Sequence, residues 1–251
     1  MKTRDRHVSR QRSIGRYRHA VCYGAFLGLA GLVFAETPNH EQAENPPVLT
    51  RPASIDSSEL LDFDKCSHAV QSLLERCLAL TRKNLGYQYG SSDPTLGGMD
   101  CSGTIYFVLQ AAGITSVPRT ASEQYVWARK AGTFHAVISR SLDSFELDAM
   151  RPGDLLFWTG TYATDRDPPV THSMIYLGKR KADGRQVMFG ASDGRSYDER
   201  KIWGVSVFDF TVSRPNAPPV PGVSTKPNSV FVGYARIPDL ERQATNEASS
   251  Q

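Results

Sequence analysis

The stretch "GMDCSG" at residues 98–103 stands where a loop rich in Gly, Ser, Asp and Pro gives way to the apolar run "TIYFVLQAA". This change of composition predicts a helix over about 101–112 that ends at Gly113. Cys101 would then open the helix, where unpaired N–H groups and the helix dipole lower the pKa of a thiol. Such a position indicates either a catalytic nucleophile or a buried structural thiol.

Helical spacing and capping signals predict two more helices. Apolar residues from Val70 to Leu78 recur at i, i+3, i+4, i+7 and i+8, which predicts an amphipathic helix over about 67–84. Thr120 and Glu123 form the capping-box pattern that begins a third, short helix. Helices followed by an antiparallel sheet predict the α+β fold class. The β-type runs of that sheet are 154–158, 172–178, 186–192, 204–210 and 230–237.

The two ends of the chain differ in composition from its centre. Residues 1–35 join a basic start to an apolar, small-residue run, which predicts a cleaved secretory signal peptide; an uncleaved membrane anchor is the alternative. A Pro-rich insert is expected at 213–229, inside the C-terminal part of the domain. The expected sections after the signal are a flexible lead at 36–56, a catalytic domain at 57–238 and a disordered tail at 239–251.

The charge balance argues against a nucleic-acid partner. The formal net charge of the full chain is +3, but residues 1–35 carry seven Lys or Arg against one Asp, which leaves −3 for the remainder. Phosphate recognition needs a Lys- and Arg-rich face, and the remainder does not suggest one. We therefore expect no nucleic-acid binding.

Three cysteines remain after the predicted signal: Cys66, Cys77 and Cys101. An odd number in an oxidising compartment leaves at least one thiol unpaired. Cys66 and Cys77 would lie about 16 Å apart on one helix, which is too far for a disulfide. Cys77 fits the apolar stripe of that helix, so we expect it in the core.

A nucleophilic cysteine needs a base, and two histidines are candidates. His135 and His172 remain once those in the signal, the lead and the first helix are set aside. His172 opens the run "HSMIYLG", where a strand can hold an imidazole rigidly at the edge of a sheet. A lone histidine at a strand start is more often structural, and it is the presence of Cys101 that favours a catalytic role.

Five motifs occur in one order along the chain: "LGYQYG" (85–90), "MDCSG" (99–103), "VPRTASEQY" (117–125), "MRPGDLLFW" (150–158) and "THSMIYLG" (171–178). Together they resemble the NlpC-type cell-wall cysteine peptidases. The resemblance covers about 67–192, and 204–237 is compatible with the last strands of the family. It implies a papain-like fold and cleavage of peptidoglycan stem peptides, most often between D-glutamate and the following diamino acid.

The resemblance implies roles for the chemistry-bearing residues. Cys101 would attack the scissile carbonyl, and His172 would form a thiolate–imidazolium pair with it and then protonate the leaving amine. The Cys101 backbone N–H and the Tyr87 hydroxyl would be candidates for stabilising the oxyanion, with packing beside the cleft as the alternative for Tyr87.

Three polar residues near the nucleophile have a substrate role by resemblance. Asp100 and Ser102 would help to bind the free amine and polar groups of the substrate; capping of the helix is the alternative for Asp100. Arg119 would pair with a substrate carboxylate or with a structural acid, and we favour the structural acid.

The sequence departs from the family at Gly190. Family members usually carry a third polar residue there, most often His, and glycine has no side chain to orient an imidazole. A tight hairpin at Asp183-Gly184 would set Ser192 opposite Ile175, so Ser192 is our candidate for the third catalytic residue. Asp193 or a backbone carbonyl are the alternatives.

These observations predict a secreted cysteine endopeptidase of the periplasm or cell envelope. A non-catalytic wall-binding protein and an amidase that cuts another wall bond are the alternatives. No cofactor is implied, because no cluster of His, Cys or Asp has the spacing of metal ligands. We expect a monomer whose partner is the peptidoglycan peptide, with no membrane span after signal cleavage.

Overall fold

The computed structural model describes residues 51–212 and 229–240. The expected signal peptide lies outside these ranges, as do most of the expected lead, insert and tail. Within them, no helix has the length and the apolar character that a membrane span requires.

Three α-helices begin where capping signals stand in the sequence. The side chain of Ser67 accepts a hydrogen bond from a backbone N–H in the first turn of α1 (His68–Thr81). Asp100 caps α2 (Cys101–Ala111), and the predicted capping box opens α3 (Ala121–Lys130). All three predicted helices are confirmed. The short 3-10 helices are η1 (Ser57–Glu59), η2 (Phe63–Lys65), η3 (Pro94–Leu96) and η4 (Phe145–Leu147).

Six strands form an antiparallel sheet in the order β3-β8-β4-β5-β6-β7, and two short strands form a separate parallel pair. Five of the six overlap the predicted β-type runs, so the existence of these strands is confirmed with small differences at their ends. The short β3 was not predicted, nor was the β1-β2 pair. The strands are β1 (Gly86–Tyr87), β2 (Gly98–Met99), β3 (Phe134–Ala136), β4 (Leu155–Thr159), β5 (Val170–Lys179), β6 (Gln186–Tyr197), β7 (Arg200–Asp209) and β8 (Val230–Ala235).

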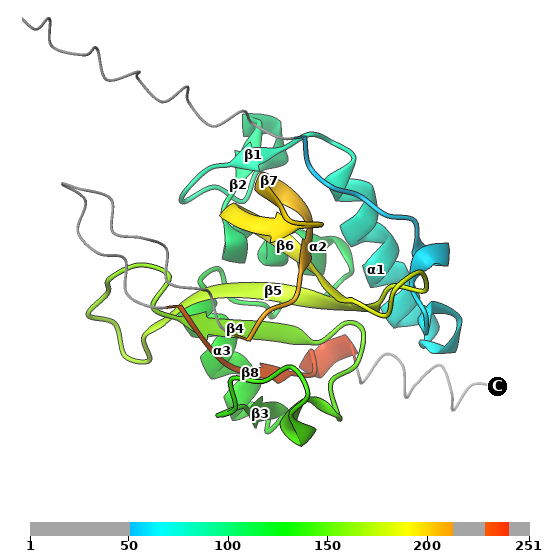
Figure 1. The fold of residues 1–251 in the computed structure, drawn as a ribbon. Coiled ribbons are helices and arrows are strands. Elements are labelled where there is room, and N and C mark those ends of the chain that lie inside the picture. The colour runs from blue at the N-terminus through cyan, green and yellow to red at the C-terminus, as the bar shows by residue number, and fades with distance from the viewer. Residues whose placement is uncertain (1–50, 213–228, 241–251) are drawn as a thin grey trace, which may run out of the picture. The chain divides into compact units, whose positions relative to one another are not determined.

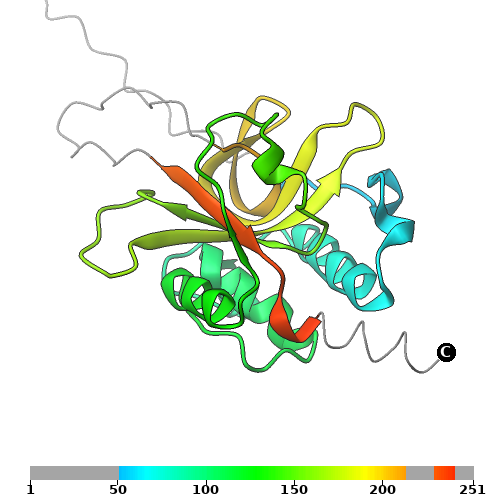
Figure 2. The same cartoon turned by 90° about the horizontal axis from the view of Figure 1, so that it is seen from below.

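The helices lie together on one side of the strands (Figures 1 and 2). Helices α2 and α3 contact β5, while α1 contacts β6 and β7. Leu73, Leu74 and Ile105 are completely buried at these contacts. Each such side chain contributes about 1.5–3 kcal/mol of transfer free energy, so the apolar stripes hold the helices on the sheet. This mixed arrangement agrees with the predicted α+β class.

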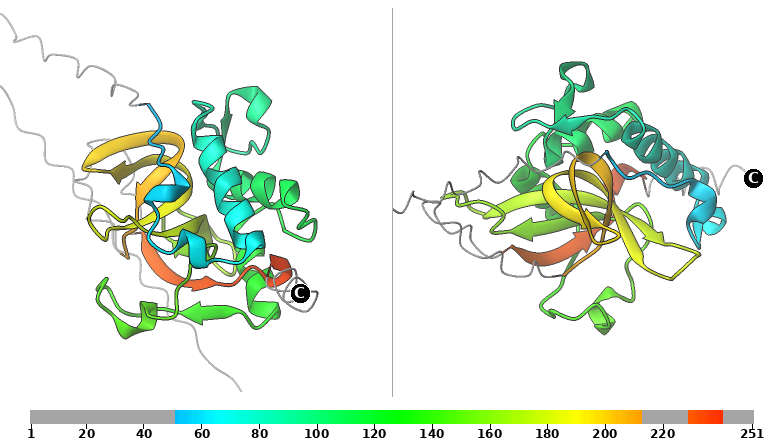
Figure 3. Two further views of the ribbon diagram at one scale, coloured as in Figure 1. Left: turned by 90° about the vertical axis from the view of Figure 1, so that its right-hand side faces the viewer. Right: turned by 45° about the horizontal axis from the view of Figure 1, so that its top comes forward.

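The β6–β7 hairpin (yellow and orange in Figure 3) closes with a two-residue turn. Tyr197 pairs with Arg200, and the intervening Asp198 and Glu199 have φ of 48° and 64°. Positive φ at both central residues defines the turn type that matches the twist of paired strands. Arg180 forms an ion pair with Asp198 at 3.0 Å and so contacts this turn.

The predicted hairpin at Asp183-Gly184 forms, but its register differs from the prediction. Ile175 pairs with Phe189, and the loop spans residues 180–185 with a bulge in β5 beside it. The predicted pairing of Ser192 with Ile175 is therefore wrong. The register differs because the loop between β5 and β6 has six residues, whereas an Asp-Gly pair favours a two-residue turn.

The folded domain extends beyond both predicted boundaries. The Ala53 backbone N–H donates to Ser206 Oγ at 2.8 Å, and its carbonyl accepts from the Val207 N–H. Ile55 is buried, and so is Leu240 beyond the other boundary. Residues 53–56 therefore extend the domain instead of belonging to a flexible lead, because they add backbone hydrogen bonds along β7.

Candidate active site

Asp100 organises the start of α2. Its Oδ1 accepts a hydrogen bond from the Gly103 N–H at 2.6 Å, and its Oδ2 accepts one from the Gly90 N–H at 2.8 Å. Arg119 donates to the same two oxygens at 3.1 and 2.8 Å, and to Ser102 Oγ at 3.1 Å. Asp100 is buried, and these bonds offset the cost of burying its charge. The helix cap and the structural ion pair, which were alternatives for Asp100 and Arg119, are therefore both present.

Gly103 allows a neighbouring loop to approach the first turn of α2. A Cβ at this position would lie 2.1 Å from the backbone oxygen of Ser91 and 2.8 Å from Nη2 of Arg119. The loop bond from the Asp100 N–H to the Ser91 carbonyl, 3.0 Å long, depends on this approach. The glycine of the "DCSG" motif is thus required by packing around the cap.

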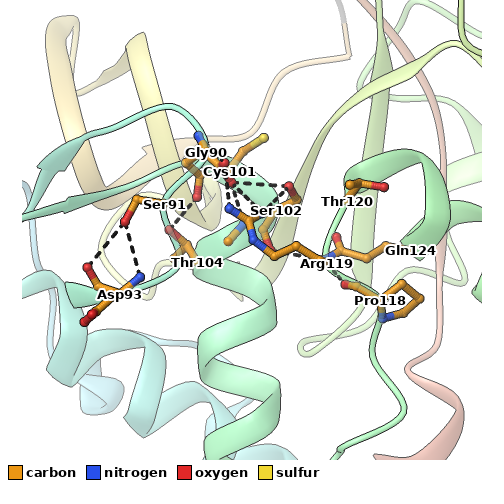
Figure 4. Close-up of polar contacts among 12 residues, drawn as sticks. Gly90, Ser91, Asp93, Cys101, Ser102, Thr104, Pro118, Arg119, Thr120 and Gln124 are labelled. Carbon is orange, nitrogen blue, oxygen red and sulfur yellow. Dashed lines mark hydrogen bonds and ion pairs between the residues drawn. The ribbon is translucent and has the colours of Figure 1, made fainter. Parts of the chain in front are cut away.

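Cys101 is the first residue of α2, and its thiol reaches the backbone on both sides of His172. Sγ lies 3.9 Å from the carbonyl oxygen of Thr171, and the Ser173 backbone N–H donates to the sulfur. Figure 4 shows Cys101 together with Ser102 and Arg119 at this helix end. The Cys101 thiol therefore contacts the backbone of the strand that carries His172.

The acidity of Cys101 differs from the prediction. Burial, followed by the neighbouring Asp100 carboxylate, raises the pKa of the thiol to about 11. Hydrogen bonds from the backbone of Ser173 and Ser102 act in the opposite direction but do not outweigh burial. The predicted lowering by the helix N-terminus is wrong for this resting state, because the prediction took no account of desolvation.

Gln124 joins the nucleophile helix to the histidine strand. Its Nε2 donates to the carbonyls of Ser102 and Pro118 at 3.1 and 3.0 Å, and its Oε1 accepts from the Ser173 hydroxyl at 2.7 Å. The side chain has no solvent exposure. The role of this glutamine was not predicted, although an uncharged polar residue inside an amphipathic helix is a signal for such a role.

Cys101 lies in a cleft of about 250 Å³. The residues that line it include Tyr87, Asp100, Ser102, Arg119, Tyr162 and Arg166. The Tyr87 ring packs edge-on against Trp203 at 6.5 Å, and burial raises the pKa of its hydroxyl, so that hydroxyl stays protonated. Tyr162 and Arg166 come from the loop before β5, which carried no recognisable sequence signal.

His172 is buried in contact with an aromatic ring and a guanidinium. The Trp158 ring lies 5.7 Å from the imidazole, centroid to centroid, with an edge-to-face geometry. Arg195 places Nε 3.3 Å from Nε2 of His172 and its guanidinium carbon 4.3 Å from the centre of the Trp158 ring. Arg195 was not predicted as a residue of the site.

Ser192, the predicted third member, lies close to this contact. Its hydroxyl oxygen accepts a hydrogen bond from the Arg195 backbone N–H at 3.3 Å. Gly190 faces Met174, whose Cγ would lie 2.9 Å from a Cβ at position 190. Met174 therefore fills the space that a side chain at position 190 would need, and Arg195 donates a hydrogen bond to the imidazole.

The described residues contain no group of three or more His, Cys, Asp or Glu placed to hold a metal ion. A larger cavity of about 430 Å³ is lined by Cys66, Val70 and Arg151, among others. The Cys66 thiol donates to the Asp62 carbonyl at 3.3 Å, whereas the Cys101 thiol contacts the backbone on both sides of His172. The smaller cleft at Cys101 is therefore the better candidate for thiol chemistry.

Residues 84–202 match the NlpC/P60 family model. The chain is 35% identical over 124 residues to the bifunctional muramidase/DL-endopeptidase CwlT of Bacillus subtilis (strain 168). The aligned region covers 49% of this chain and 30% of that protein. The chain is 27% identical over 138 residues to a gamma-DL-glutamyl hydrolase of the same organism, covering 52% of this chain and 28% of the hydrolase. The matched region thus spans less than a third of either relative.

Proposed function

We propose, from the match of residues 84–202 to the NlpC/P60 family model, that this protein is a cysteine peptidase that hydrolyses peptidoglycan stem peptides. The observation that carries the proposal is the position of the Cys101 thiol. It lies in a cleft at the start of α2 and contacts the backbone on both sides of His172. By analogy with the NlpC/P60 family, we propose that the arrangement of helices and sheet is papain-like.

The proposed reaction begins with transfer of the Cys101 proton to His172. Sγ then bonds to the scissile carbonyl carbon, and the oxyanion that forms is stabilised by the Cys101 N–H and the Tyr87 hydroxyl. The carbon–nitrogen bond breaks as His172 returns the proton to the leaving amine. Water hydrolyses the resulting thioester, which releases the new carboxylate and restores the thiol.

The starting pKa of about 11 makes a base essential in this scheme. A thiol with so high a pKa holds very little thiolate at neutral pH, so the reaction depends on a histidine that can take the proton during the attack. The same reasoning makes the placement of His172 the property on which the rate depends.

We propose that the bond cleaved joins D-glutamate to the following diamino acid. The names of the two relatives, a DL-endopeptidase and a gamma-DL-glutamyl hydrolase, are consistent with this choice. Stem peptides carry free carboxylates, and Arg166 in the cleft is available to bind one. Among the described residues, no carboxylate lies within ion-pair distance of Arg166, which contacts Tyr162 at 2.5 Å.

The remaining proposals follow from the sequence. The basic and apolar segment at 1–35 supports export across the inner membrane to the periplasm or cell envelope. A monomer suffices for the chemistry, because one chain supplies the nucleophile, the base and the cleft.

Mass spectrometry of muropeptides incubated with the purified protein tests the proposed function. We expect fragments that end at D-glutamate, together with peptides that begin at the diamino acid. Release of intact stem peptides from muramic acid would instead identify an amidase. Binding to wall material without any new fragment would identify a wall-binding protein.

A further inference from the structure

A bulge in β6 brings Arg195 to the histidine. The pairing of β6 with β7 skips one residue, Gly194, just before Arg195. Residues of a strand alternate between its two faces, so the skip moves Arg195 onto the face that carries Gly190. Met174 contacts position 190 and so lies on the same face of the sheet. His172 is two residues before Met174 in β5, so its side chain lies on that face as well.

The contact between the two side chains fixes the protonation of the ring. A guanidinium has five N–H donors and no acceptor, and it stays charged in proteins. A hydrogen bond from Arg195 Nε to His172 Nε2 at 3.3 Å therefore requires a lone pair on Nε2. The guanidinium is buried and lies over the Trp158 ring, an arrangement that holds it in this position.

We propose that Arg195 is a positioning residue that keeps His172 neutral, with the ring proton on Nδ1. In this state the Cys101–His172 pair rests as thiol and imidazole. The protonation state of His172 is inferred from its hydrogen bond with Arg195. The effect of that state on turnover rests on the proposed function.

The contact opposes formation of a thiolate–imidazolium pair. When His172 takes a proton, both ring nitrogens carry hydrogen, and Nε2 can no longer accept a bond from Arg195. The imidazolium would also lie beside a second positive charge, which disfavours it. A hydrogen-bond acceptor beside the ring nitrogen would favour the imidazolium. Arg195 is a donor at this position, so its effect on His172 is the opposite.

Other ionisable groups lie around this end of β5, among them Tyr162 and Arg166 in the cleft. Cys101 on α2 is neutral in the resting state, and the Asp100–Arg119 pair behind it carries no net charge. Tyr87 on β1 stays protonated. Asp193 on β6 lies two residues before Arg195 and pairs with Trp203 on β7.

Nitrogen NMR of the full chain labelled at histidine tests the proposal without relying on turnover. We expect the wild-type His172 signal to show an unprotonated Nε2 and a pKa below the ordinary value of about 6.5. The signal is assigned by its absence from His172→Gln. An Nε2–H tautomer, or a pKa at or above the ordinary value, would overturn the proposal even if no Arg195 variant folds.

Variants at Arg195 separate charge from packing. Arg195→Gln offers an acceptor, so we expect the pKa of His172 to rise by about one unit and alkylation of Cys101 at pH 7 to become about tenfold faster. Arg195→Lys keeps the cation and should leave both values near those of the wild type. Asp193→Asn is the matched control and should not raise the pKa of His172. A folded Arg195→Gln protein with both values unchanged would contradict the proposal.

Discussion

The guanidinium of Arg119 binds both carboxylate oxygens of Asp100, with Nη1 3.1 Å from Oδ1 and Nη2 2.8 Å from Oδ2. The same carboxylate caps α2 through the Gly103 N–H. The ion pair thus fixes the end of the helix from which Cys101 projects, and the placement of the nucleophile depends on a residue 18 positions further along the chain.

Removing the guanidinium should therefore destabilise the protein. We expect Arg119→Met to lower the free energy of unfolding by about 2 kcal/mol, less than for a fully buried pair because the Arg119 side chain is 30% exposed. Arg82→Met, which removes an exposed pair with Asp56, should cost less than about 1 kcal/mol. Urea denaturation measures both. Equal losses in the two variants would show that Arg119 is an ordinary surface charge.

Gly103→Ala should be destabilising although alanine is the better helix former. Helix propensity alone would favour alanine by about 1 kcal/mol, but the new Cβ would lie 2.1 Å from the Ser91 carbonyl oxygen. We expect a net loss of roughly 3 kcal/mol or more, with loss of activity. Gly132→Ala, where nothing lies within 4 Å but φ is +73°, should cost only about 1 kcal/mol. A thermal melt of Gly103→Ala at or above that of the wild type would refute the close approach.

Gln124→Leu should separate the nucleophile helix from the histidine strand. The substitution keeps the side-chain volume but leaves the Ser102 and Pro118 carbonyls and the Ser173 hydroxyl without this partner. We expect roughly 1–3 kcal/mol of lost stability per unsatisfied group and a fall in kcat/KM of at least tenfold. The control, Gln110→Leu, removes a single bond to the Thr115 carbonyl at 3.2 Å and should be nearly neutral. Wild-type kinetics in Gln124→Leu would exclude the bridging role.

The raised pKa of Cys101 predicts a steep pH dependence of alkylation. Because the thiol pKa is about 11, the thiolate fraction should rise about tenfold per pH unit between pH 7 and pH 9.5. Iodoacetamide labelling of the Cys101 peptide, followed by mass spectrometry, gives the rate at each pH. The same peptide in unfolded protein should level off near its ordinary pKa of about 8.5. A native rate that is already constant at pH 7 would reveal a preformed thiolate.

The start of α2 could be predicted from sequence because its determinants are local. Asp100 and Gly103 lie within one turn of Cys101, so capping rules and composition suffice to place the nucleophile. The capping box of α3 is equally local, and it was confirmed at Thr120 and Glu123.

The environment of His172 could not be predicted, since it depends on strand register. A two-residue turn was expected at Asp183-Gly184, whereas Ile175 pairs with Phe189 across a wider loop. The bulge that turns Arg195 inward depends on β7, which pairs with β6 through a turn that contains no glycine. Desolvation of the Cys101 thiol likewise arises only when the sheet packs against α2.

Cys101→Ala tests the central claim most directly, with release of muropeptide fragments as the measurement and circular dichroism as the check on folding. The account predicts no turnover in this variant, because no other thiol of the described residues lies in the cleft. It predicts full turnover in Cys66→Ala, because Cys66 lines the other cavity. Fragment release by folded Cys101→Ala at the wild-type rate would contradict the proposed cysteine peptidase mechanism.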